Sequence, residues 1–137
     1  MAYALVGLKE IIEDFDKLIH FSDDMIDEML DAEAKVMIAA EQATASTMLE
    51  GPYNKGAVVR SIAQGNKRGT STGRYTDIIF KGTQHGERLA AIAYINEFGK
   101  TNQPARPFIM TAVNMAKDIA VDSAARVYEE FLRQCNF

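Results

Sequence analysis

The chain has 137 residues, of which 47% are hydrophobic and 25% are charged. This size and composition are typical of a single globular core, so we expect one domain over residues 1–137. The formal net charge of -4 excludes a general electrostatic attraction to nucleic acid, and the single cysteine, Cys135, excludes an internal disulfide. No apolar run approaches the roughly 18 residues that cross a bilayer, so we expect a protein made in the cytoplasm with no membrane partner.

Two helices are expected in the first third of the chain. Apolar residues at helical spacing predict a short helix within 1–21 that docks on the core. A second amphipathic pattern predicts a long helix over 22–50. Ser22 is a suitable N-cap for this helix, and Gly51 and Pro52 are expected to end it.

Methionines recur along the apolar stripe of the long helix, including Met25, Met29 and Met37. The thioether side chain repacks easily, so these residues could form an adaptable surface for a partner protein. An amphipathic stripe is more often ordinary core, and the pattern favours that interpretation. The two interpretations are both retained, with the three methionines as candidate interface residues.

Residues 57–98 are expected to form a small, mostly antiparallel sheet, because β-branched and aromatic residues cluster there in short runs between glycines. Residues 58–63 and 75–80 predict the first two strands. Residues 89–98 predict a third, central strand, because an apolar run on both faces indicates burial on both sides. The polar segment 65–73 has little to bury and predicts a mobile loop.

After residue 107 the helical period returns, and one apolar stripe predicts a C-terminal helix over 107–134. Pro104 and Pro107 each favour extended geometry in the preceding residue, and Pro107 suits the first turn of a helix. We therefore expect a stiff lead-in at 104–108. The order of elements predicts an α+β fold, with the long N-terminal helix and the C-terminal helix on one face of the sheet.

Arg106 would lie beside the positive end of the C-terminal helix, where a cation is unfavourable unless an acceptor compensates its charge. Glu97 is the nearest carboxylate in the sequence. We therefore predict a contact between Arg106 and Glu97 that fixes the lead-in.

The chain offers little material for catalysis. His20 and His85 lie in separate polar segments, and no second ligand or base is spaced to act with either of them. His85 stands between glycines and is interpreted as a solvated turn residue. The glycines between 65 and 86 match neither the phosphate loop nor the dinucleotide fingerprint. We expect no catalytic residue, cofactor or metal, and hence a protein that is not an enzyme.

Lys67, Arg68 and Arg74 make the polar segment and its edge basic. They could contact DNA phosphates or an acidic neighbouring subunit, or could simply be solvated, because three cations give only a weak, salt-dependent attraction. A small DNA-binding module that uses residues 67–74 is therefore the alternative function.

Two motifs resemble a family of tailed-phage proteins, found in siphophages and prophages as head-tail joining, neck, minor tail or tail-completion components. Family members typically run from Glu-Phe-Gly-Thr through a variable loop into Pro-Ala-Arg-Pro-Phe, which 97–101 and 104–108 resemble with Lys100 inserted before the threonine. Residues 51–62 are similar to the family's Ala-Pro-Val-Asp-Thr-Gly-x-Leu-x-x-Ser-Ile, and 7–10 are similar to its start. The matching positions are Pro52, Gly56, Ser61, Ile62, Glu97, Phe98, Gly99, Pro104, Arg106, Pro107 and Phe108.

The resemblance implies a structural virion protein that acts in head-tail connection or tail completion by assembling with other neck and tail proteins. It implies a homo-oligomeric ring in the virion, with six subunits as one option, and it allows a monomer for the isolated subunit. DNA would be met at most in the connector lumen. The protein would be made in the host cytoplasm and end in the virion. We expect the long helix and the lead-in before Phe108 to supply the two unlike patches that a ring contact needs.

Overall fold

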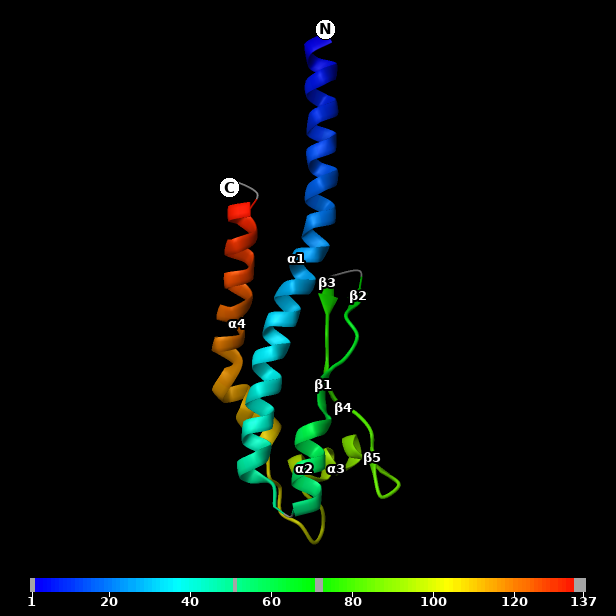
Figure 1. Cartoon of the computed structure of the whole chain (residues 1–137), viewed down its shortest axis with the longest axis vertical. Coiled ribbons are helices and arrows are strands. Elements are labelled where there is room, and N and C mark those ends of the chain that lie inside the picture. Colours follow the sequence, from blue (N-terminus) through cyan, green and yellow to red (C-terminus); the bar gives the residue numbers. More distant parts are fainter. Residues whose placement is uncertain (1, 51, 71–72, 135–137) are drawn as a thin grey trace.

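The computed structural model describes residues 2–50, 52–70 and 73–134, and within these it describes the side chains outside 2–7, 14–22 and 52–55 (Figure 1). Two long helices dominate the molecule: α1, Ala2–Met48, and α4, Phe108–Gln134. They run in opposite directions and pack side by side, and the N-terminal part of α1 extends well beyond the C-terminal end of α4 (Figure 1). Gly51 and Cys135 lie outside the described residues.

Shorter elements lie between the two long helices in the sequence. They are helix α2, Pro52–Ser61, helix α3, Leu89–Phe98, and the strands β1, Ile62–Gln64, β2, Arg68–Thr70, β3, Gly73–Tyr75, β4, Ile78–Phe80, β5, Thr83–Gln84, and β6, Glu87–Arg88. Most of them gather around the other end of the helix pair, and β2 and β3 extend along α1 (Figure 1). The strands pair antiparallel as β1 with β4, β2 with β3, and β5 with β6. The predicted α+β fold is confirmed, and the strands form three sheets of two strands each.

The prediction of a separate docking helix within 1–21 is wrong, because α1 runs unbroken from Ala2 to Met48. Ser22 therefore lies in the helix interior and is not an N-cap. No proline interrupts this stretch, and its serine and aspartates lower helix stability by only a few tenths of a kcal/mol each, roughly. The expected end of the long helix near residue 50 is confirmed within two residues.

The prediction of a strand over 58–63 is also wrong for most of its length. The chain forms helix α2 up to Ser61, and only Ile62 and Ala63 belong to β1. Ala57, Val58, Ser61 and Ile62 are buried, a spacing that places them on one face of a helical turn. Here tertiary burial of a helical face outweighs the β propensity of the two valines.

The predicted central strand over 89–98 is helix α3. Its buried residues are Leu89, Ala93, Asn96 and Glu97, which is the spacing of a single helix face. A short apolar run does not distinguish a buried strand from a buried helix. Ten residues exceed the length of an ordinary strand, and three alanines favour the helix.

The second predicted strand, 75–80, is divided between the end of β3 and β4. Where a loop was predicted over 65–73, the described residues include β2 and Gly73, the first residue of β3; residues 71–72 lie outside the description. His85 is confirmed as an exposed turn residue, since it has a φ of 52° and precedes Gly86, with a φ of 80°, between β5 and β6. Two consecutive residues with positive φ are typical of a tight hairpin turn.

The hydrophobic core lies where the C-terminal half of α1 meets α2, α3, β4 and the first turn of α4. Its buried members are Ala45, Leu49, Ala57, Val58, Ile62, Leu89, Ala93 and Phe108. The Phe108 side chain is fully buried. Its ring packs edge-on against the Phe80 ring, with 6.0 Å between the two ring centroids. Further along α4, Ala112, Ala116, Ala120 and Ala124 are buried at every fourth residue. These small side chains form a narrow stripe that lets another helix approach closely.

Candidate functional site

The segment between α3 and α4 forms a compact elbow over residues 99–107. Gly99 ends α3 with a φ of 79° and a ψ of 177°, and its backbone N–H donates to the Ile95 carbonyl at 2.7 Å. A Cβ at Gly99 would lie 2.8 Å from the Ala105 nitrogen and 2.9 Å from the Gln103 carbonyl oxygen. Both the backbone conformation and the space therefore require glycine here.

Hydrogen bonds fold the elbow back against α3. Lys100 and Gln103 exchange two backbone bonds, and the Arg106 N–H donates to the Asn96 carbonyl at 2.6 Å. The Asn96 side chain also accepts from the Gln103 amide at 3.1 Å. Phe108 then enters the core, so the lead-in is held at both ends.

Glu97 binds the start of α4. Its two carboxylate oxygens accept the backbone N–H groups of Ile109, at 2.8 Å, and Met110, at 3.1 Å. The first N–H groups of a helix have no partner within the helix, and a negative charge at this end is favourable. Glu97 thus satisfies two of these donors from the neighbouring helix α3.

The predicted contact between Arg106 and Glu97 is wrong. The Arg106 guanidinium lies 3.2 Å from the Glu50 carboxylate and 3.5 Å from the Asn96 side-chain oxygen. Glu97 is buried and engaged by α4, whereas Glu50 is largely exposed and free to approach the arginine. The cation beside the helix start is still compensated, but by a different carboxylate.

Two residues of α1, Glu41 and Thr44, face this junction and were not predicted. The Thr44 hydroxyl donates to the Phe108 carbonyl at 2.8 Å. Glu41 is only 4% exposed, and its Oε2 atom has no hydrogen-bond partner within the described part of the chain. The pKa of Glu41 is raised to about 7, mainly by burial and to a smaller extent by the negative charge of Glu97. A glutamate inside an otherwise apolar stripe, between Ile38 and Ala45, is the sequence signal that could have revealed it.

A shallow polar cavity of about 130 Å³ lies beside the elbow. Its lining residues are Glu50, Glu87, Ile92, Ile95, Asn96, Lys100, Gln103 and Arg106. Neither Glu41 nor Glu97 lines it, and both are less than a tenth exposed. The buried carboxylates are therefore not presented to a molecule in this cavity.

The other motif residues belong to α2 and β1. Pro52 begins α2, where its missing N–H costs nothing. Gly56 lies inside the helix, where a Cβ would meet the movable end of Arg60 at 3.1 Å. Ser61 is buried, and its hydroxyl donates to the Val58 carbonyl at 2.7 Å, while Ile62 enters the core.

Two basic residues in and next to the β2–β3 hairpin form ion pairs with aspartates of α1. Lys67 lies 2.9 Å from the Asp31 carboxylate, and its hydrogen bond lowers the pKa of that carboxyl. Arg74 makes two hydrogen bonds to the Asp27 carboxylate, at 2.7 and 3.1 Å. Arg68 is exposed on β2, opposite Tyr75. At least two of the three predicted interface cations therefore have a structural role in attaching the hairpin.

Several large apolar side chains lie on the surface. On α1, Leu8, Ile11 and Ile12 are between 52 and 53% exposed, so they do not dock on the core as expected. On α3, the Tyr94 and Phe98 rings contact each other at 4.8 Å and are both about two-thirds exposed. On α4, the exposed apolar residues are Met110, Met115, Ile119, Val121 and Tyr128. Met25, Met29 and Met37 are half-buried on α1, so they are neither fully enclosed core nor open surface.

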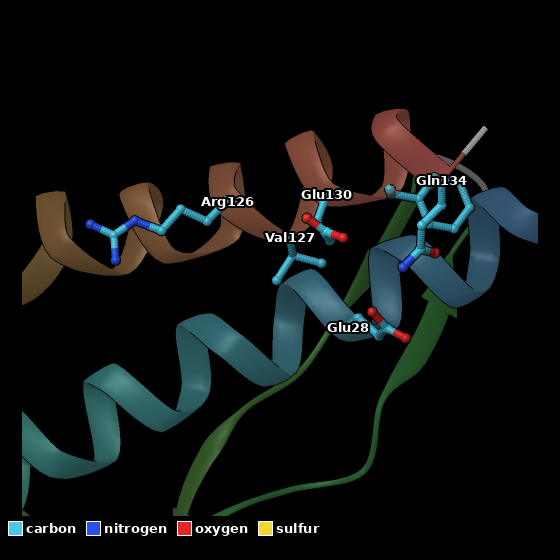
Figure 2. A pocket seen from close by; sticks show the side chains of 6 residues that line it. Glu28, Arg126, Val127, Glu130 and Gln134 are labelled. Carbon is cyan, nitrogen blue, oxygen red and sulfur yellow. The ribbon is translucent and has the colours of Figure 1, made fainter. Parts of the chain in front are cut away.

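An open groove of about 250 Å³ lies between α1 and the C-terminal end of α4 (Figure 2). Glu28 reaches it from α1, and Arg126, Val127, Glu130 and Gln134 line it from α4. The Arg126 side chain is directed along α4, away from Glu28 (Figure 2). Over residues 2–50, 52–70 and 73–134, no three histidine, cysteine, aspartate or glutamate side chains are grouped so that they could hold a metal ion.

Comparisons with protein-family models, with curated proteins and with solved structures found no match to this chain. The phage-protein resemblance therefore stays a prediction. Among the described helices, none combines the length and the apolar character needed to cross a membrane.

Proposed function

We propose that this protein is a non-enzymatic structural subunit of a tailed-phage or prophage virion, acting in head-tail connection or tail completion. The observation that carries the proposal is a contrast between two parts of the molecule. Hydrogen bonds fix the elbow at residues 99–107, whereas large apolar side chains on α1 and α4 are exposed. Leu8, Ile11 and Ile12 on α1, and Val121 and Ile119 on α4, are each more than half exposed. Exposed apolar surface of this kind is typical of sites where another protein binds.

The roles of the motif residues support the same proposal. Gly99 permits the sharp turn, Glu97 binds the first turn of α4, and Phe108 anchors that turn in the core. Each of these residues maintains the angle between α3 and α4. A subunit that must match its neighbours needs such a fixed shape, whereas none of the three roles requires a reaction.

The buried carboxylates are the arrangement that would most favour an enzyme, and their surroundings argue against one. Glu97 is occupied by two backbone N–H groups, and Glu41 is buried. A general acid or base must reach its substrate within hydrogen-bonding distance. The DNA-binding alternative gains no support either, because Lys67 and Arg74 already neutralise Asp31 and Asp27.

The test is deletion of the gene from the phage or prophage that encodes the protein, followed by electron microscopy of the lysate. We expect filled heads and tails that remain separate from each other. The wild-type gene supplied in trans should restore infectivity. Intact infectious particles from the deletion strain would contradict the proposal.

The same strain can test the uncovered surface. Ile12→Glu places a charge in the exposed apolar group of α1, and Glu10→Lys is the matched control at another exposed position of the same helix segment. Because both positions are exposed, both variants should keep the wild-type melting temperature. Ile12→Glu should fail to restore infectivity and Glu10→Lys should restore it; equal restoration by both would remove this surface from the proposal.

A further inference from the structure

We propose that Glu97 and Thr44 form a clasp that holds the first turn of α4 against α3 and α1, and that the proton on the buried carboxyl of Glu41 controls this clasp. The clasp is closed when Glu41 is neutral and is weakened when Glu41 is ionised. This inference goes beyond the proposed function, because it assigns a regulatory role to a residue outside the family-like motifs.

The geometry gives the two carboxyls different roles. Both oxygens of Glu97 accept backbone N–H groups of α4, at 2.8 and 3.1 Å, so these donors compensate the carboxylate. Glu41 differs, because its buried Oε2 is without a hydrogen-bond partner among the residues that the structure describes. A buried carboxylate without donors is strongly disfavoured, whereas the protonated form can be tolerated there.

The charged groups around Glu41 do not offset this difference. From α3, the ionised Glu97 repels a second negative charge, and the pKa of Glu41 is raised to about 7 by burial and by Glu97 together. From the elbow, Arg106 is engaged by Glu50 and Asn96. From α4, the N-terminal N–H groups are taken up by Glu97, and the nearest cation along that helix is Lys117, which is exposed.

Ionisation of Glu41 would weaken the hydrogen bond between the Thr44 hydroxyl and the Phe108 carbonyl. Thr44, one helical turn beyond Glu41, donates its hydroxyl to the Phe108 carbonyl and so joins α1 to the start of α4. A second negative charge beside Glu97 would also compete with the role of Glu97 at the helix N-terminus. The expected response is local opening of the first turn of α4.

The sign of the pH dependence follows from the raised pKa. Glu41 binds its proton more tightly in the folded protein than in the unfolded chain, whose pKa is near the ordinary 4.5. Its contribution to stability is therefore complete below pH 4.5 and is lost as the pH rises through 7. Between pH 5 and pH 8, we expect the folding equilibrium constant to fall on the order of a hundredfold from this group.

The test compares the full-length wild type with Glu41→Gln, which keeps the shape of the side chain without the titrating proton. Denaturant midpoints measured from pH 5 to pH 8 should fall for the wild type and should fall much less for Glu41→Gln. Glu28→Gln, at an exposed carboxyl elsewhere on α1, should keep the wild-type pH profile.

Two further measurements separate the clasp from general destabilisation. Hydrogen exchange at the Ile109 and Met110 amides, corrected for intrinsic rates, should rise with pH in the wild type more than exchange at the middle of α4. Should Glu41→Gln fail to fold, carbon NMR titration of the wild-type Glu41 carboxyl replaces it. A midpoint near 4.5, or equal pH slopes for wild type and Glu41→Gln, would overturn the proposal.

Discussion

The two ends of the α1–α4 helix pair differ in how their apolar residues are covered. At the elbow end, α2, α3 and β4 enclose Phe108 and its neighbours. A hydrogen bond donated by Thr44 and hydrogen bonds accepted by Glu97 and Asn96 fix the chain there. At the opposite end, α1 continues past the last turn of α4 (Figure 1) with apolar residues such as Leu8 and Ile12 exposed.

This contrast shows that the same sequence pattern has two outcomes within one helix. An amphipathic stripe is buried where the chain supplies a second layer and is exposed where it does not. The elbow end can therefore be stable in the single chain, whereas the open end presents apolar surface that the described residues leave uncovered. Three substitutions with matched controls and one double-mutant cycle would break or sharpen this comparison.

The largest effect is expected for two phenylalanines on either side of the elbow. Phe108→Ala removes a fully buried ring and should lower the free energy of unfolding by about 3–5 kcal/mol. Phe98→Ala removes a ring that is 66% exposed and should cost less than about 1 kcal/mol. Urea denaturation of both variants measures the difference, and similar losses would mean that the core is not centred on Phe108.

Two glycines with nearly equal φ provide the next comparison. Gly99 has a φ of 79°, and a Cβ added there would lie within 3 Å of backbone atoms of the elbow, while Gly86 has a φ of 80° and nothing within 4 Å of the same position. Gly99→Ala should cost about 2–3 kcal/mol, and Gly86→Ala about 1 kcal/mol, because only the first adds crowding to the unfavourable dihedral angle. Equal losses in thermal or chemical denaturation would show that the elbow can relax.

Two threonines of α1 test the contact between α1 and α4. Thr44→Val removes the hydroxyl that donates to Phe108 and leaves a buried carbonyl without that donor, so it should cost about 1–2 kcal/mol. Thr47→Val removes a hydroxyl that bonds only within its own helix, to Ala43 and Thr44, and should be nearly neutral. Denaturation midpoints would decide, and a neutral Thr44→Val would show that this bond does not hold α4.

The smallest effect is expected at the β2–β3 hairpin. Arg74 and Asp27 form a bidentate pair whose side chains are each a little over a quarter exposed. Arg74→Ala should cost less than about 1 kcal/mol, and a double-mutant cycle with Asp27→Ala should give a coupling of that same order. A coupling of zero would mean that the hairpin is held to α1 by other contacts.

The sequence was sufficient to predict features that depend on local signals. The start of α4 followed from Pro107, the end of α1 from the Gly-Pro pair near residue 50, and the turn at His85 from its flanking glycines. Each of these residue types restricts the backbone directly. Such signals act within a few residues and need no knowledge of the rest of the fold.

The errors arose where tertiary packing decides. Leu89–Phe98 forms a helix because Leu89, Ala93 and Glu97 face the core together. The periodicity of an apolar run does not by itself distinguish this from a buried strand, and the length and the alanines of this run were weaker signals for a helix. The partners of Arg106 and Glu97 could not be predicted either. Glu50 and the N-terminus of α4 are brought to them only by the folding of α1 and α4 around the elbow.

The most direct test of the account is cryo-electron microscopy of the neck and tail of the virion, with the protein identified in the purified particle. We expect a ring of this subunit at the head-tail junction or tail end, with the elbow fold unchanged and with Leu8 and Ile12 covered by a neighbouring chain. Purified virions that contain no copy of the protein, or a bound subunit whose N-terminal α1 surface stays open to solvent, would contradict it.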